Sequence, residues 1–443
     1  MQIDKTSYYD LAIFQQEEEF SVFHKLDFTR TVAGREWLMR FFREPFSNLS
    51  EIQSTQQILK CILRHIDAWP PSISNGTLLV IEKFLDYNLD PFPESADQMN
   101  SYLYRLLHSP DFSLARYSLT HFADFVRGMQ TLLALLDTSD APPKLQIILS
   151  QARILMKHKH LEELGSRPEG KAFSIRETVY YGRFFHEQFR QHGLVLIQLF
   201  SQLDAWYAMA KAVQVYQLCF PEIDAQEDPR IEAEGLFHLL LDKPVSYDLS
   251  MHPAANFIFL TGANMAGEST FIKSVGLAVF LAHIGMGVPA KSMRMTLFDG
   301  ILSNINVVDN IAKGESYFYN EVQRIRHTVE TINDNRRWLV LIDELFKGTN
   351  IQDAMKCSTT VIRGLIKINR ALFILSTHLY EIAEELKTYP NIAFKYFETR
   401  IQDDQLEFSY QLKDGISNDR LGYLILKREK VVELLEQIPA RKP

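Results

Sequence analysis

The chain has 443 residues, which is enough for two or three domains with sizeable hydrophobic cores. Its formal net charge of -8 excludes attraction of nucleic acid by overall charge, although an acidic protein can still carry a basic groove. The three cysteines, Cys61, Cys219 and Cys357, are far apart and form no CxxC pair. They therefore support neither a disulfide framework nor a zinc site.

The sequence also lacks the features of a secreted or membrane protein. The N-terminus has no apolar signal core. The most apolar stretch, residues 275–290, is interrupted by His283 and three glycines and is too short to span a bilayer. We therefore expect a soluble, cytoplasmic protein.

The first half of the chain is predicted to be helical. Residues 31–42 and 50–66 place apolar side chains three and four positions apart, and proline pairs divide this half into blocks. Residues 179–216 contain no proline and are predicted to form one very long helix, or two. We assign residues 1–230 to a helical domain.

From about residue 231 the pattern changes to short apolar runs that alternate with helical segments. Three such runs, each followed by a turn-like loop and a helix, are residues 257–260, 338–343 and 371–376. This alternation is typical of a mainly parallel sheet covered by helices. The tail predicts a hairpin from residues 394–401 and 405–412, followed by an amphipathic helix. We assign residues 231–443 to an α/β domain.

The first of these runs leads into TGANMAGEST, residues 261–270, which has the spacing of a phosphate-binding loop. In such a loop, glycines let the backbone N–H groups at a helix N-terminus approach phosphate oxygens. Ser269 is a candidate magnesium ligand, and Thr270 a phosphate contact. Position 268, where lysine is expected, is glutamate, and a plain strand-to-helix turn is the alternative. The candidate nucleotide-binding residues are Gly262, Ala263, Asn264, Met265, Ala266, Gly267, Glu268, Ser269 and Thr270.

The other two apolar runs also end at polar residues. Asp343 is a candidate magnesium residue, and Glu344 is a candidate for polarising the attacking water. His378, after the third run, could reach a γ-phosphate, although a lone histidine or a strand ending in acids is often merely structural. Ligands bind at the carboxyl edge of open parallel sheets, so three such strand ends together predict a nucleotide site.

These motifs resemble those of the MutS family of DNA mismatch-repair ATPases, relatives of the ABC ATPases. The resemblance rests on TGANMAGEST, IAKGESYFYNEVQRI, LVLIDELFKGTN and STHLYE, in this order. Residues 21–59, 203–212, 220–235 and 410–426 also resemble family segments, so the likeness extends through nearly the whole chain. It implies an α-helical core or lever domain followed by an ABC-type P-loop ATPase domain that uses ATP and Mg²⁺.

The resemblance also implies roles for single residues. Asn264, Gly267, Ser269 and Thr270 would belong to the phosphate loop, with Asp343 at the magnesium ion. Glu344 would act on the water and His378 would sense the γ-phosphate. Gly314 and Ser316 match a signature segment that in this family acts on the nucleotide of a second subunit. A homodimer with two composite nucleotide sites is therefore expected.

Several departures from the family pattern limit this transfer. Glu268 replaces the loop lysine, Phe346-Lys347 replaces glycine-arginine, and Tyr317 replaces threonine. The sequence lacks the mismatch-reading and connector domains, and no Smr-type nuclease domain follows. Residues 140–180 are too few for a full DNA clamp, and their basic cluster at 157–160 is more typical of a solvated helix face. DNA binding is expected to be weak and not mismatch-selective.

Two hypotheses follow, from different functional classes. The first is a DNA-associated ATPase whose nucleotide state moves the levers of a dimer. The second is a non-catalytic, nucleotide-responsive interaction protein descended from such an ATPase. An unrelated P-loop phosphotransferase would leave the matches outside the ATPase domain unexplained. In either case we expect Glu268 to weaken nucleotide binding without abolishing it, with its flexible carboxylate free to swing toward solvent.

Overall fold

The computed structural model describes residues 1–226, 228–263, 266–306, 317–402, 405–417 and 430–436. The chain divides into two compact units. The α/β unit comprises Met1–Lys25, Glu44–Ile52 and Tyr216–Pro443, and the helical unit comprises Leu26–Arg43 and Gln53–Val215. The domain boundary at residue 230 stays a prediction. In the structure, the first 25 residues belong to the α/β unit.

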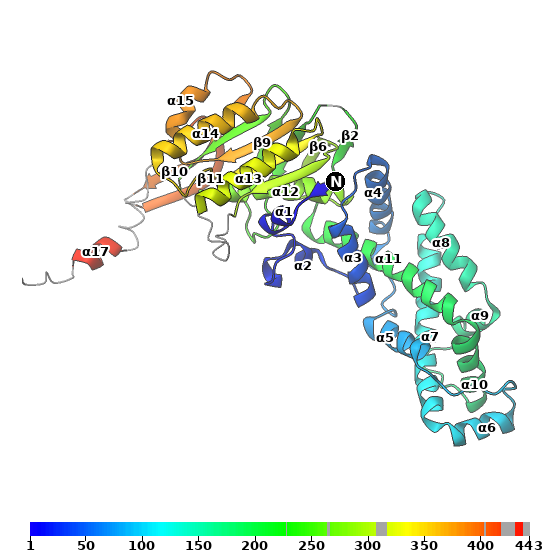
Figure 1. Ribbon diagram of the computed structural model, residues 1–443. Helices are drawn as coiled ribbons and strands as arrows, with labels where there is room; N and C mark the ends of the chain where they lie inside the picture. The colour runs from blue at the N-terminus through cyan, green and yellow to red at the C-terminus, as the bar shows by residue number, and fades with distance from the viewer. Residues whose placement is uncertain (227, 264–265, 307–316, 403–404, 418–429, 437–443) are drawn as a thin grey trace, which may run out of the picture. The chain divides into compact units, whose positions relative to one another are not determined.

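The helical unit is built from helices (Figure 1), and its core is formed by their buried apolar residues. Its helices are α3 (Val32–Arg43), α4 (Leu49–Leu63, which begins in the α/β unit), α5 (Asn75–Asp86), α6 (Gln98–Leu107), α7 (Ser109–Leu136), α8 (Pro143–Met156), α9 (Lys159–Gly165), α10 (Ile175–Arg183) and α11 (Arg190–Tyr216). A π-helical turn, η3 (Phe184–Gln188), separates α10 from α11, and Phe189 N donates to Phe184 O at its end (2.8 Å). Of the two alternatives for residues 179–216, two helices is therefore the correct one.

A buried carboxylate connects the two ends of the helical unit's sequence. Asp204 of α11 is completely buried. It accepts hydrogen bonds from Arg30 N (3.1 Å), Thr31 N (3.0 Å) and Thr31 Oγ1 (2.7 Å). Gly34 lies so close to Asp204 that a Cβ atom there would collide with the carboxylate. These hydrogen bonds hold the residues just before α3 against α11.

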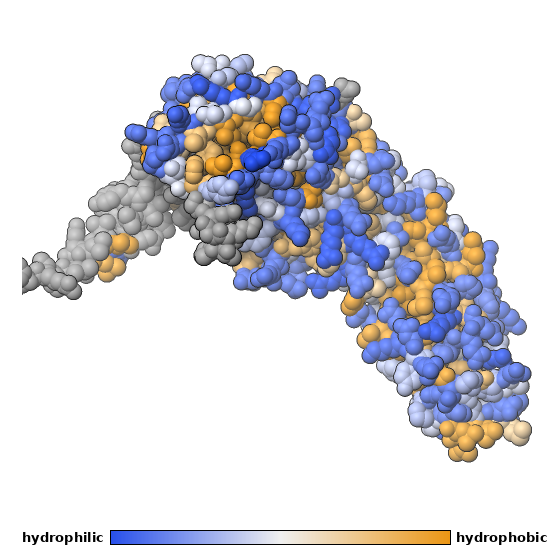
Figure 2. All heavy atoms as spheres, viewed as in Figure 1, coloured by the Kyte–Doolittle hydropathy of each residue, from blue (hydrophilic) through white to orange (hydrophobic). Residues whose placement is uncertain are grey.

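One helix of this unit carries an exposed apolar surface. Figure 2 shows apolar side chains gathered over α6. Met99, Leu106 and Leu107 are 77%, 78% and 65% exposed, and Leu103 is half exposed. Exposed apolar residues are normal when scattered, but several on one ten-residue helix form a patch.

The α/β unit is organised around a seven-stranded sheet with the order β1-β7-β8-β9-β5-β10-β11. Its strands are β1 (Gln2–Ile3), β5 (Phe257–Thr261), β7 (Gly300–Asn304), β8 (Trp338–Asp343), β9 (Ala371–Ser376), β10 (Ile392–Gln402) and β11 (Gln405–Asp414). All neighbours are parallel except β10 and β11. The three predicted strands, the mainly parallel sheet and the hairpin are confirmed. Strands β1 and β7 were not predicted from the sequence.

Helices cover both faces of this sheet, as Figure 1 shows. On one face, Phe259, Val340 and Phe373 belong to a hydrophobic core with residues of α13, α14 and α15. On the other face, Gly276 lets α12 approach Leu341 closely. The covering helices are α12 (Glu268–His283), α13 (Tyr317–Ile332), α14 (Ile351–Leu365) and α15 (Ala383–Leu386). Because both faces are buried, the central strands are apolar throughout.

A smaller, four-stranded sheet completes the α/β unit. Its order is β2-β6-β3-β4, formed by β2 (Glu222–Asp224), β3 (Ile231–Leu236), β4 (Tyr247–Met251) and β6 (Ser292–Thr296). Further helices among the described residues of the unit are α1 (Lys5–Asp10), α2 (Val22–Leu26) and, after β11, α17 (Val431–Glu436). Among the described helices, none is long and apolar enough to cross a membrane.

Candidate functional site

The candidate phosphate loop joins β5 to α12, as its sequence predicts. Gly267 precedes the first turn of α12 with a φ of 113°, a left-handed conformation that favours glycine. Among the described residues no side chain caps this end of α12, which leaves its first backbone N–H groups available to an external acceptor. The structure describes Gly262, Ala263 and Ala266 to Thr270 of the loop, whereas Asn264 and Met265 lie outside the described residues.

Asp343, at the end of β8, contacts the start of helix α12 and the end of β9. Ser269 Oγ at the start of α12 donates to Asp343 Oδ2 (2.5 Å), and Ser376 Oγ at the end of β9 donates to Asp343 Oδ1. The predicted metal pair, Ser269 and Asp343, is therefore brought together. A hydroxyl beside a carboxylate is the oxygen-donor set that Mg²⁺ prefers, so these residues fit such an ion.

Glu344 and His378 form a second contact beside this pair. Glu344 Oε1 lies 2.8 Å from His378 Nε2, and Glu344 Oε2 forms an ion pair with Lys347 Nζ. The other ring nitrogen of His378, Nδ1, lies 3.1 Å from Gly262 O. The histidine thus connects the phosphate loop to the acidic end of β8, and Glu344 is held between two basic side chains.

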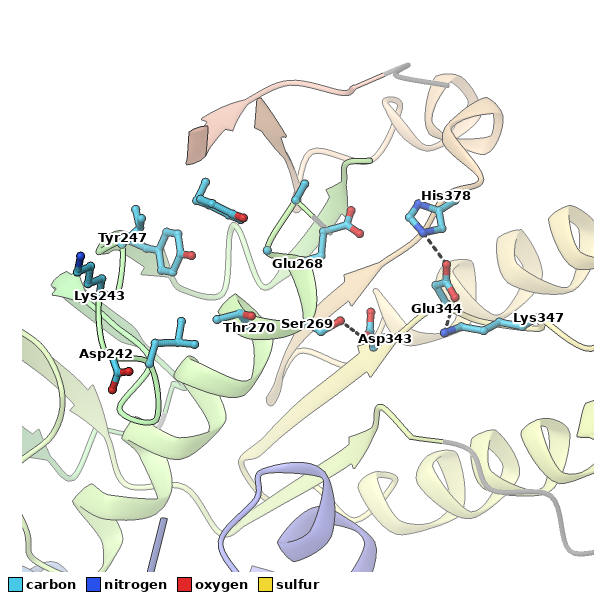
Figure 3. Close-up of a pocket in the computed structure, with 15 residues that line it drawn as sticks. Asp242, Lys243, Tyr247, Glu268, Ser269, Thr270, Asp343, Glu344, Lys347 and His378 are labelled. Carbon is cyan, nitrogen blue, oxygen red and sulfur yellow. Dashed lines mark hydrogen bonds and ion pairs between the residues drawn. The ribbon is translucent and has the colours of Figure 1, made fainter. Parts of the chain in front are cut away.

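These groups line a cavity of about 600 Å³, within the range of small-molecule and cofactor sites. Figure 3 shows them around the cavity, with Lys243 and Tyr247 on one side and Glu344, Lys347 and His378 on the other. The lining residues are Leu241, Asp242, Lys243, Val245, Tyr247, Ala266, Gly267, Glu268, Ser269, Thr270, Asp343, Glu344, Lys347, His378 and Tyr410. The arrangement has room for a ligand with an uncharged part near Tyr247 and anionic groups near the start of α12.

The structure corrects one expectation about Glu268. Its side chain does not swing toward solvent but is only 8% exposed, packed beside Gly262. Burial raises the pKa of this carboxyl to about 8. Its Oε1 atom has no hydrogen-bond partner among the described residues. Packing against the loop therefore overrides the flexibility of the isolated side chain.

Comparison with known proteins agrees with this geometry. The family model of MutS domain V matches residues 258–437, which include the phosphate loop, Asp343, Glu344 and His378. The chain is 28% identical over 299 residues to the DNA mismatch repair protein MutS of Petrotoga mobilis, covering 64% of this chain and 36% of that protein. These matches support a MutS-family protein, with residues 258–437 similar to MutS domain V.

Other MutS relatives match a similar portion of the chain. The DNA mismatch repair protein MutS of Thermotoga maritima is 27% identical over 54% of this chain and 30% of its own length. That of Pseudothermotoga lettingae is 31% identical over 52% of this chain and 29% of its own length. The chain thus spans about a third of the length of the curated MutS proteins it matches.

Other predicted residues of the MutS pattern are not placed. Gly314 and Ser316 of the signature segment lie outside the described residues, so their part in a composite site stays a prediction. Tyr317, which departs from the MutS pattern, is the first residue of α13.

Three residues at this MutS-type site were not among the predicted site residues. Ser376 holds Asp343, and its signals in the sequence are its place at the end of an apolar strand and at the start of the STHLYE segment. Glu321 of α13 is buried and accepts hydrogen bonds from Lys347 N (3.1 Å) and Gly348 N (3.2 Å). Lys347 was noted only as a departure from the family pattern. None of these contacts follows from local sequence, because each joins separate elements.

Glu321 supports a backbone segment with unusual geometry. Glu344 and Phe346 have φ values of 59° and 61°, in the left-handed region that costs a non-glycine residue about 1–2 kcal/mol. The Phe346 ring packs against Phe318 of α13, with ring centroids 5.7 Å apart. Together, the carboxylate and the ring contact hold residues 344–348 in the shape that directs Glu344 and Lys347 to the cavity.

Proposed function

We propose that the α/β unit binds ATP together with Mg²⁺ and that the chain is an ATPase of the mismatch-repair type. The observation that carries this proposal is the convergence of Ser269, Asp343, Glu344 and His378 on one cavity beside the open N-terminus of α12. The match to MutS domain V over the same residues supports it.

Each side chain has a chemical task in this proposal. The N–H groups at the start of α12 bind phosphate oxygens, and Ser269 and Asp343 hold Mg²⁺, which neutralises charge on the phosphates when bound. Glu344 accepts a hydrogen bond from the attacking water, and His378 contacts the terminal phosphate. Glu344 must first exchange its contacts with Lys347 and His378, because both of its oxygens are engaged.

A second candidate is a nucleotide-responsive protein without catalysis. Glu268 favours it, because a carboxyl group replaces the cation that stabilises the transferring phosphoryl group. In this alternative, ATP binding alone changes the state of the protein. Hydrolysis is the measurement that separates the two.

The assembly is also part of the proposal. We infer a homodimer in which nucleotide state drives lever motion, because Gly314 and Ser316 match the signature segment. Light scattering with an ATP analogue should detect this dimer. A strict monomer would contradict the inference. DNA binding should be weak, steeply salt-dependent and indifferent to mismatches, which a gel shift on matched and mismatched duplexes would measure.

Titration calorimetry and phosphate release on the parent chain and on Glu268→Lys test the nucleotide site. We expect the lysine to tighten ATP binding on the order of 30- to 1000-fold, because an attraction replaces an unfavourable carboxyl. ADP should gain less, since it lacks the γ-phosphate. Turnover should rise, and adding Glu344→Gln should remove that gain. Absence of ATP binding in both forms would reject the proposal, whereas tight binding without turnover in both would select the non-catalytic alternative.

A further inference from the structure

The phosphate end of the cavity has lost its expected cation at position 268, yet it is not without a basic side chain. The cavity is lined by two lysines, Lys243 and Lys347, and they occupy different sides (Figure 3). Lys243 lies beside Tyr247, away from the acidic end of β8. Lys347 extends toward Glu344, beside Asp343 and His378, where the terminal phosphates of a bound nucleotide would meet the start of α12.

Lys347 combines a fixed backbone with an adaptable side chain. Its backbone N–H donates to the buried carboxylate of Glu321, and its neighbour Phe346 packs against Phe318. Its side chain is 41% exposed and, among the described residues, forms an ion pair with Glu344. A lysine is a compact charge on a flexible four-carbon stem, so its ammonium can change partners while its backbone stays in place.

The present partner of Lys347 can release it at little cost. Glu344 has two oxygens, and His378 already contacts the other one at 2.8 Å. The ion pair is partly open to solvent at its lysine end, which weakens it, whereas a nucleotide phosphate offers more charge and more acceptors. Transfer of the ammonium to phosphate would also free one Glu344 oxygen to face water.

We propose that Lys347 is the phosphate-binding cation of this site, taking the place of the lysine that the loop lacks. The proposal rests on the nucleotide-binding function proposed above and goes beyond it, because it assigns charge recognition to the loop that follows β8. Lys347 is then the residue that distinguishes a nucleoside triphosphate from a monophosphate.

Fluorescence titration of the full chain with labelled ATP and labelled AMP, at fixed Mg²⁺ and ionic strength, tests this assignment. Lys347→Met should weaken ATP binding by about tenfold or more, the loss expected for one charge-assisted contact, and change AMP binding less than about twofold. Lys347→Arg should retain most of the ATP affinity. Lys356→Met removes the same charge from an exposed position on α14, outside the cavity, and should behave as the parent.

A double-variant comparison gives the sharper test. If Lys347 replaces the missing loop lysine, then Lys347→Met should cost much less ATP affinity when Glu268→Lys is also present, because the loop then has its own cation. Thermal unfolding of each variant separates a loss of binding from a loss of folding. A structural role for the Lys347–Glu344 pair would weaken ATP and AMP binding equally and would overturn the proposal.

The remaining outcomes are also decisive. If the parent binds ATP and Lys347→Met binds it equally well, the assignment of Lys347 is wrong while the nucleotide site stands. If Lys243→Met removes the preference for ATP instead, the cation lies on the Tyr247 side and the assignment is wrong. If the parent and Glu268→Lys both fail to bind ATP, the proposed function fails, and the role of Lys347 fails with it.

Discussion

Two buried carboxyl groups, Asp204 of the helical unit and Glu268 of the phosphate loop, have opposite surroundings. Burial raises the pKa of Asp204 to about 6, and the donors Thr31 and Arg30 hold it below the value that burial alone would give. Burial raises the pKa of Glu268 to about 8, and its Oε1 has no partner among the described residues. The carboxyl group of Asp204 is satisfied by its own fold, whereas one oxygen of Glu268 finds no partner in the described part of the chain.

The difference shows what each group contributes. A buried polar group with all its partners holds its neighbours in place, whereas one without partners costs free energy at its position. Asp204 therefore belongs to the structure of the helical unit. Glu268 is expected to lower the stability of the α/β unit, at the cavity that it lines. Replacing Asp204 is therefore expected to lower the stability of the protein, whereas replacing Glu268 is expected to raise it.

The largest expected effect is on Asp204. Asp204→Asn should lower the free energy of unfolding of the helical unit by about 4 kcal/mol, because the amide must turn an N–H group toward a backbone donor of Arg30 or Thr31. Urea unfolding followed by circular dichroism would measure it. Asp140→Asn is the matched control, since Asp140 is exposed and pairs with the exposed Arg64. Equal small losses for both variants would contradict the structural role of Asp204.

The next effect concerns His283, a buried group that is satisfied only in its neutral form. It is fully buried; Nδ1 donates to Phe46 O (2.9 Å), and Nε2 accepts from Phe298 N (3.2 Å). Burial lowers its pKa to about 4. As pH falls, the unfolded chain takes up a proton at this histidine before the folded chain does, because its pKa is higher in the unfolded chain. The stability that neutral His283 contributes is therefore complete above about pH 6.5 and is lost as pH falls to about 4. The loss amounts to at most about 3 kcal/mol.

His283→Gln tests this pH dependence, because glutamine offers one donor and one acceptor but does not titrate. We expect the variant to lose less stability than the parent between pH 6.5 and 4, as measured by chemical unfolding at each pH. His327→Gln, at an exposed position on α13, should leave the parent's pH dependence unchanged. Identical pH profiles for the parent and His283→Gln would show that His283 does not contribute to acid sensitivity.

The smallest effect has the opposite sign. Glu268→Met keeps the length of the side chain and removes the carboxyl group that lacks a partner for Oε1. The α/β unit should gain about 1–2 kcal/mol of stability at neutral pH, the cost of burying an unsatisfied polar group. The same unfolding measurement applies, with Glu384→Met as the exposed control. A loss of stability would mean that Glu268 is held by contacts and that the contrast with Asp204 is wrong.

Local sequence was sufficient for much of the fold and for several residues that the structure brings together at the cavity. The runs at 257–260, 338–343 and 371–376 are apolar because both faces of their strands are covered, and each forms a strand close to its predicted bounds. Gly267 takes the left-handed conformation that its place in the loop requires. Ser269, Asp343, Glu344 and His378 could be named in advance, because parallel strands bring their carboxyl ends to one edge.

Only the tertiary structure decided how these residues are paired and which of them are buried. Ser269 meets Asp343 across 74 positions of sequence, Glu321 reaches the backbone of Lys347 across 26, and β1 joins the sheet beside β7. Glu268 looks like a solvent-exposed charge in sequence, yet packing against Gly262 buries it. Periodicity and turn chemistry are properties of neighbouring residues and can be read along the chain. Desolvation and pairing depend on which distant elements the fold places around a side chain, so they arise only when the core is assembled.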